Sequence, residues 1–188
     1  MEATGGTVAT SPCGNFKTHT FTGPGSFCVS NAGNAGGSNS VEYIVVGGGA
    51  SGGGGYYGGG GGAGGFRFAS PSLAPATYPA KPLAAPANVP ISVQSYPIVV
   101  GGGGASQSSS CVRGNSGVNS SFSTIVSAGG GGGGVWGNSA PTAPLRTGVA
   151  GGSGGGAGSQ NSPSSPGSAG TGGAGNTPPV SPPQGKDG

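Results

Sequence analysis

The hydrophobic residues of this chain gather in short β-branched or aromatic runs, each of which ends abruptly in glycine. The pattern occurs at "VEYIVVGGG" (Val41 to Gly49), at "YPIVVGGGG" (Tyr96 to Gly104) and, as a variant, at "FSTIVSAGGGGGG" (Phe122 to Gly134). Runs that are apolar on both faces are typical of buried β-strands. No segment has a convincing 3.6-residue period, so the sequence predicts an all-β protein with essentially no α-helix.

Two further patterns lie between these runs. Strand-forming residues flank Gly23-Pro24-Gly25 in "NFKTHTFTGPGSFCVS", which predicts a β-hairpin with a tight loop. In "SPSLAPATYPAKPLAAPANVP" a proline recurs at nearly every fourth residue. Proline at this density excludes a helix and favours an extended crossing of polyproline II type.

These patterns divide the chain into segments. We expect an N-terminal tail (1–15), a β-hairpin and strand scaffold (16–46), a polyglycine excursion (47–65), a proline-rich crossing and strand (66–100), a region of polyglycine, loop, strand and polyglycine (101–134), and a Gly/Pro/Ser-rich continuation (135–188). The last segment ends "NTPPVSPPQGKDG" with no returning strand. We therefore expect the chain to be a fragment of a longer protein.

Composition changes the picture of what holds such a chain together. Glycine accounts for 49 and proline for 17 of the 188 residues, a level at which low complexity or disorder is the default expectation. Charged residues are only 5% and the net charge is +3, whereas disordered chains usually combine low hydrophobicity with high net charge. The apolar fraction of 31% is too small for an ordinary core in a chain of this length. Either the glycine tracts are flexible linkers, or backbone contacts replace side-chain burial.

The attachment of the glycine tracts to strands favours the second alternative. A collagen helix is excluded because "GGGGYYGGGGGAGG" keeps no Gly-X-Y frame. Polyglycine II is an extended helix with three residues per turn and no internal hydrogen bonds, so its amides must bond to neighbouring helices. The strands would anchor these helices in register. The tracts predicted to be ordered in this form are Gly47–Gly49, Gly52–Gly55, Gly58–Gly65, Gly101–Gly104 and Gly129–Gly134.

Catalytic chemistry is not indicated. His19 is the only histidine, so neither a Ser-His-acid triad nor a histidine-rich metal site is expected. The acidic residues are far apart in the sequence, which argues against paired-carboxylate catalysis. The Lys and Arg residues are scattered and form no nucleic-acid patch. The sequence therefore predicts a protein that is not an enzyme, with no cofactor, no metal and no nucleic-acid partner.

The cysteines and the lack of targeting signals bear on disulfide bonds, secretion and membrane insertion. Cys13 and Cys28 lie near the predicted hairpin, so a bridge between them is one alternative and reduced thiols the favoured one; Cys111 would be free in either case. The N-terminus has no basic and apolar signal-peptide pattern. No apolar run approaches the roughly 20 residues of a membrane helix, so we expect no membrane insertion.

The order of the blocks "HTFTGPGSFCVS", "VEYIVVGGGASGGGGYYGGGGGAGGFR", "YPIVVGGGG" and "SSFSTIVSAGGGGGG" resembles that of the glycine-rich tail-fibre proteins and distal adhesins of tailed bacteriophages. The resemblance covers most of residues 16–188. It implies a small jelly-roll-like or sandwich β-scaffold interleaved with a packed polyglycine II bundle, whose tip loops contact the host. It also implies a virion protein that forms a homo-oligomer, with a trimer favoured, or binds other fibre proteins.

Aromatic residues are the candidate contact residues. Tyr56-Tyr57 interrupts one glycine tract and Trp136 follows another. If residues 47–65 form two helices, the tyrosines lie at the turn between them, far from the strands. There they would contact a host-surface glycan or protein, or else cap the bundle by burial. The alternative function is an extracellular filament or surface-layer structural protein.

Overall fold

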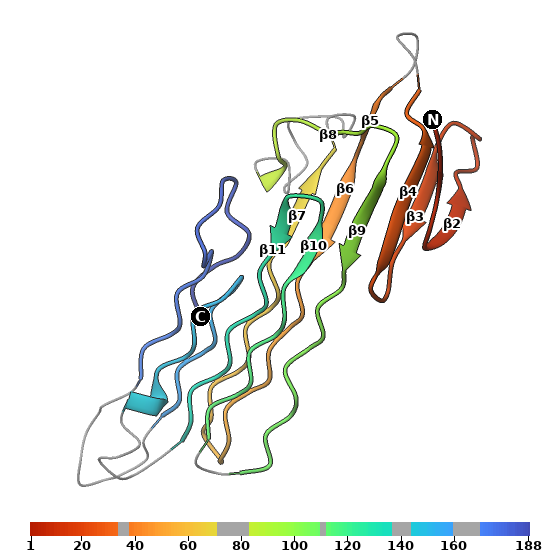
Figure 1. Cartoon of the computed structure of the whole chain (residues 1–188). Helices are drawn as coiled ribbons and strands as arrows, with labels where there is room; N and C mark the ends of the chain where they lie inside the picture. Colours follow the sequence, from red (N-terminus) through yellow and green to blue (C-terminus); the bar gives the residue numbers. More distant parts are fainter. Residues whose placement is uncertain (34–37, 71–82, 110–111, 137–143, 160–169) are drawn as a thin grey trace, which may run out of the picture.

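The computed structural model describes residues 1–33, 38–70, 83–109, 112–136, 144–159 and 170–188. It is an elongated molecule in which β-strands occupy one end and extended glycine tracts run side by side to the other (Figure 1). The strands are β1 (Glu2–Thr4), β2 (Thr7–Thr10), β3 (Lys17–Thr20), β4 (Gly25–Asn31), β5 (Ser40–Val41), β6 (Tyr43–Val46), β7 (Phe66–Ala69), β8 (Val89–Pro90), β9 (Ser95–Val99), β10 (Ser120–Phe122) and β11 (Ile125–Ser127). A 3₁₀ turn, η3, spans Pro144–Arg146.

The strands form antiparallel sheets around a small apolar core. One five-stranded sheet has the order β1-β4-β9-β10-β11, and β2-β3, β5-β8 and β6-β7 form two-stranded sheets. The β6-β7 pair lies against β10 and β11. The buried core comprises Phe27, Val29, Tyr43, Val45, Ala69, Ile91, Tyr96 and Phe122. The described residues contain no α-helix, so the all-β prediction is confirmed.

The prediction of a hairpin around Gly23-Pro24-Gly25 is wrong. Strands form on both sides of this turn, but β3 pairs with β2, while β4 pairs with β1 and β9. The turn carries the chain from one sheet to another, and the His19 ring packs edge-on against Phe27 at 5.0 Å between centroids. Residues 1–15, predicted as a tail, supply β1 and β2. The pairing differs because burying Phe27 in the larger sheet outweighs the local preference for a hairpin.

The other predicted strands form where the apolar runs lie. β6 and β9 precede glycine tracts as expected, while the third run folds into the hairpin β10–β11, with Ser123 at a φ of 52° in its turn. Residues 71–82 of the predicted proline-rich crossing lie outside the described residues. The end of that segment forms β8, which pairs with β5.

Beyond the strands, the glycine tracts are joined by backbone hydrogen bonds that recur every third residue. The amides of Gly47, Ala50 and Gly53 donate to the carbonyls of Gly65, Gly62 and Gly59, which makes these two tracts antiparallel neighbours. Side-by-side packing of this kind repeats across the bundle. Exposure follows the same period, because Gly59, Gly62 and Gly65 are buried, Gly60, Gly61 and Ala63 between them are exposed, and Gly64 is half-buried. This repeat is the one that three residues per turn would produce.

The tract Gly129–Gly134 is the axis of the bundle. Every one of its residues is buried, and Val135 after it is fully buried. Its amides and carbonyls bond to tracts on several sides: Gly130 donates to Gly48, Gly131 donates to Ser153, and Gly133 accepts from Gly114. The core of this half of the molecule is therefore glycine backbone rather than apolar side chains.

Amide exchange tests the order of these tracts. Gly62 donates its amide to Gly131 O at 2.8 Å and is buried, whereas Gly60, two residues away, is exposed and its amide makes none of the described backbone bonds. We expect Gly62 to exchange at least about a hundredfold more slowly than Gly60, since protected amides exchange only through opening of the bundle. Equal, fast exchange at both positions would show that the tracts are flexible linkers and would contradict the polyglycine II prediction.

Candidate functional site

The three aromatic residues singled out in the sequence lie together at the distal end of the bundle, the end opposite the strands. Tyr56 and Tyr57 occupy the turn between the two antiparallel tracts, where Gly55 has a φ of 94°. Trp136 follows the central tract and donates its backbone N–H to Gly54 O at 3.1 Å. In Figure 1 this turn lies at the lower end of the molecule, farthest from β6 and β7.

The rings form one cluster with the indole at its centre. The Tyr56 and Trp136 centroids are 6.2 Å apart with the rings nearly perpendicular, and the Tyr57 and Trp136 centroids are 6.3 Å apart. Tyr56 is 92% exposed and Tyr57 50%, while Trp136 is half-buried. The aromatic residues were expected either to be exposed for contact with the host or to cap the bundle by burial. Tyr56 is exposed, and the half-buried Trp136 packs against its ring.

Two arginines lie near this end. Arg113 donates from Nε to Leu145 O at 3.2 Å, and Leu145 O also accepts the amide of Val135, next to Trp136. Arg146, beside Leu145, is 3% exposed. In the sequence Arg113 and Arg146 are only two scattered positive charges, because they are far apart along the chain.

The acidic residues lie elsewhere. Glu2 belongs to β1, Glu42 precedes β6, and Asp187 accepts the amide of Gly175 at 2.7 Å through Oδ1. Gly175 lies close to the strand half, because its neighbour Asn176 donates to Gly152 and Gly152 donates to Gly129, at the start of the central tract. The Asp187 carboxylate therefore does not neutralise the distal end. The described part of that end therefore has a net positive charge alongside its aromatic rings.

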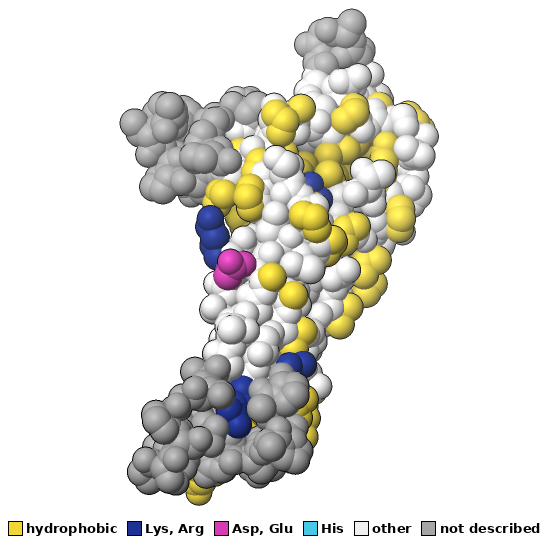
Figure 2. Space-filling model, turned by 90° about the vertical axis from the view of Figure 1, so that its left-hand side faces the viewer, with side chains coloured by type: hydrophobic (Ala, Val, Ile, Leu, Met, Phe, Trp, Pro, Cys, Tyr) yellow, Lys and Arg dark blue, Asp and Glu magenta, His cyan; other side chains and the backbone are white. Residues whose placement is uncertain are grey.

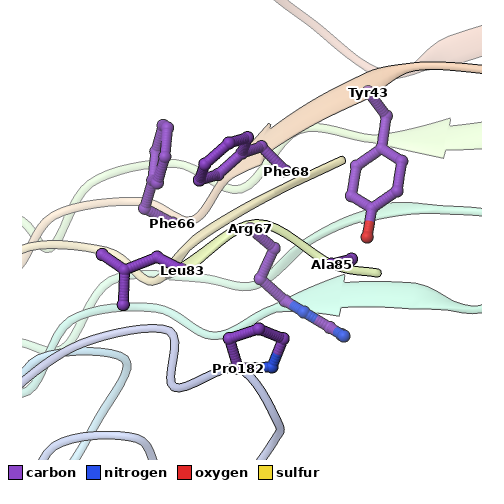
Figure 3. Close-up of a pocket in the computed structure, with 7 residues that line it drawn as sticks. All are labelled: Tyr43, Phe66, Arg67, Phe68, Leu83, Ala85 and Pro182. Atoms are coloured by element: carbon purple, nitrogen blue, oxygen red, sulfur yellow. The ribbon is translucent and has the colours of Figure 1, made fainter. Parts of the chain in front are cut away.

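The cavity beside β7 is too small for a ligand. The cavity in Figure 3, beside β7, is about 10 Å³ and lies among Tyr43, Phe66, Arg67, Phe68, Leu83, Ala85 and Pro182. This is room for one water molecule at most. Arg67 passes through it and donates from Nη1 to Val126 O at 3.1 Å on β11, so its role there is to satisfy a sheet edge.

A wider, open groove of about 330 Å³ runs beneath the β1–β2 and β3–β4 turns, between Gly5-Gly6-Thr7 and the segment Thr20–Ser26. Its lining has hydroxyl groups and one aromatic ring but no charged side chain. No group of three metal-ligating side chains occurs in the described parts of the chain.

A family model described as a glycine-rich domain matches residues 10–188, which is nearly the whole chain. The chain belongs to this glycine-rich domain family. No curated protein and no solved structure is detectably similar to it. Membership in this family accounts for the high glycine content of the chain.

The two described cysteines of this glycine-rich domain are not cross-linked. Cys13 and Cys28 are both free and exposed, and Cys111 lies outside the described residues. The hydroxyl of Ser11, 3.2 Å from Cys13 Sγ, lowers the pKa of that thiol. Among the residues the structure describes, no helix has the length and apolar character needed to cross a membrane.

Proposed function

We propose that this glycine-rich domain is a structural and adhesive component of a bacteriophage tail fibre, located in the virion, and that it attaches the fibre to the host surface. The observation that carries the proposal is the aromatic cluster of Tyr56, Tyr57 and Trp136, held at the end of a long bundle away from the strands. Recognition residues are commonly placed on loops that a rigid scaffold positions.

The bundle suits such a role because its stiffness comes from backbone hydrogen bonds. Figure 2 shows hydrophobic side chains over the strand half and a middle section that is largely white, the colour of backbone and of side chains that are neither hydrophobic nor charged. Changes in the distal side chains therefore leave the bonds between tracts in place. In this proposal the tracts are polyglycine II helices, which matches the three-residue spacing of their bonds.

The exposed surface indicates the kind of ligand. Tyrosine offers a large apolar face and a hydroxyl at low cost in side-chain entropy, which suits contact with a sugar ring or a protein surface. The proposed ligand is therefore a host-surface glycan or protein. Trp136 is the weaker contact, because it is half-buried. Other fibre proteins, or further copies of the chain, would attach elsewhere on the molecule.

Replacement of both tyrosines tests the proposal. We expect Tyr56→Ser/Tyr57→Ser to retain its melting temperature and to lose at least about tenfold in binding to a susceptible strain, as for the loss of an interface hot spot. Fluorescently labelled protein would be measured by flow cytometry on a panel of bacterial strains. The matched control is Phe16→Ser, which removes an aromatic ring that is 64% exposed and lies at the strand end.

The proposal fails if the doubly substituted protein binds as well as the original, or if the original binds no strain of the panel. The latter result would favour an extracellular filament or surface-layer protein. A double variant that does not fold would show that the tyrosines belong to the scaffold, and the single Tyr56→Ser variant, at the more exposed position, would then test attachment.

A further inference from the structure

The segment Gly101–Ser109, which continues β9 into the bundle, has one side turned inward and two turned to solvent. Residues 101, 104 and 107 are half-buried, whereas the two residues after each of them are exposed. The exposed positions are Gly102, Gly103, Ala105, Ser106, Ser108 and Ser109. A period of three over this length is that of an extended three-fold helix lying on the surface of the bundle.

The described bonds of this segment join it to Gly49 and to three residues of the neighbouring tract, Asn115, Val118 and Ser120, and Asn115 Nδ2 donates to Ala105 O at 2.8 Å. Gly101 donates its amide to Ser120 Oγ at 2.9 Å, and Gly102 O accepts the amide of Val118 at 2.9 Å. Gly104 donates to Gly49 O at 2.8 Å. The amides of Gly102 and Gly103 have no described partner within the chain, and a Cβ built on Gly102 would meet nothing within 4 Å.

The outer side is open because one row of the sheet does not continue into the bundle. In the sheet, β9 lies between β4 and β10. The β10 row continues alongside the segment through Val118, but β4 begins at Gly25, opposite Ile98, and the chain before it turns away to β3. Figure 1 shows no described segment beyond the green tract on the side where β4 lies.

We propose that this edge, Gly101–Ser109, pairs with the same edge of a second copy of the chain. The exposed side chains are all small and uncharged, so two backbones can approach closely and no charge is desolvated. With a rise of about 3.1 Å per residue, the edge is about 28 Å long, and unpaired backbone groups on an exposed edge invite a further strand.

The bundle itself supplies the precedent for such pairing. Its tracts bond as antiparallel neighbours, as between 47–53 and 59–65, and as parallel neighbours, where Gly130 and Gly133 donate to Gly48 and Ser51. Identical edges can therefore meet about a two-fold axis in either direction. This contact deepens the proposed function, because it names a second copy of the chain as one partner of the fibre component. Only the biological role of the dimer rests on the proposed function. It closes a dimer, not the trimer that the tail-fibre resemblance implies.

Sedimentation of the protein between about 10 μM and 1 mM tests the contact, since small interfaces associate weakly. We expect a monomer–dimer equilibrium, with amide protection at Gly102 and Gly103 rising with concentration. Gly102 and Ala105 are three residues apart and lie in the same exposed row, so in Gly102→Lys/Ala105→Lys four lysines would face one another across the two-fold axis. We expect the dimer dissociation constant to rise at least about tenfold, and to recover in part at high salt.

The matched control is Ser30→Lys, which adds a charge at an exposed position of β4 and should leave the dissociation constant unchanged. A monomer up to 1 mM, a trimer, or a dimer indifferent to the edge lysines would each overturn the proposal. Cell binding is measured separately with the tyrosine variants. Failure of attachment and failure of dimerisation are therefore distinguishable.

Discussion

Replacing Gly131 with alanine is expected to destabilise the protein by about 3 kcal/mol or more, a large part of the roughly 5–15 kcal/mol that stabilises a typical domain. Gly131 lies in the buried central tract, where its amide donates to Ser153 O and its carbonyl accepts from Gly62. A Cβ at this position would overlap the carbonyl oxygen of Val149 and crowd Ala150. Because these neighbours are backbone atoms, a whole tract would have to move to make room.

The matched control is Gly102→Ala, at a glycine of the outer tract. A Cβ there meets nothing within 4 Å, and neither Gly102 nor Gly131 has a positive φ. We expect Gly102→Ala to be neutral or to stabilise by up to about 1 kcal/mol, because alanine restricts the unfolded chain. Urea titrations of both variants measure the difference. Similar stabilities for the two would show that the central tract is not close-packed as the structure describes.

Replacing Gln184 with alanine should cost about 2–4 kcal/mol, the second-largest effect, because its buried side chain joins two segments. The carboxamide is 3% exposed, accepts the amide of Ala128 at 2.8 Å through Oε1, and donates from Nε2 to Pro178 O at 2.9 Å. Ala128 stands where β11 passes into the central tract. Without the Gln184 side chain, the buried amide of Ala128 would lose its hydrogen-bond partner at the junction between the two halves of the molecule.

Two further variants separate the loss of the Gln184 hydrogen bonds from the loss of its side-chain volume. Gln184→Met keeps most of the volume and removes both hydrogen bonds, so we expect it to retain a loss of about 1–3 kcal/mol. Gln94→Ala removes an exposed glutamine whose side chain bonds to Ser92 Oγ and to the Tyr96 hydroxyl at the surface, and should change stability by less than about 1 kcal/mol. If Gln184→Ala were as mild as Gln94→Ala, the carboxamide would not hold the junction.

The candidate site was predictable in its parts and not in its assembly. The position of Tyr56 and Tyr57 at a distal turn follows from a glycine tract that leaves a strand, is interrupted midway and returns to a strand. Their contact with Trp136 does not, since it depends on which tract lies beside residues 47–54. The proximity of Arg113 and Arg146 likewise arises from tracts that are remote in sequence.

The sequence by itself determined that the apolar runs before the glycine tracts are strands, where the tracts leave them, and that α-helix is absent from the described residues; it missed β1 and β2. These are local properties, because β-branched runs favour strands and glycine tracts have no side chains with which to form an ordinary core. Only the tertiary structure decided that β3 and β4 pair with different partners, that Gly129–Gly134 is the buried axis, and that Gln184 caps the amide of Ala128. The physical reason is that one glycine tract presents the same backbone groups as another. The neighbours of each tract are therefore set by the strands that hold its end and by the few side chains placed between tracts.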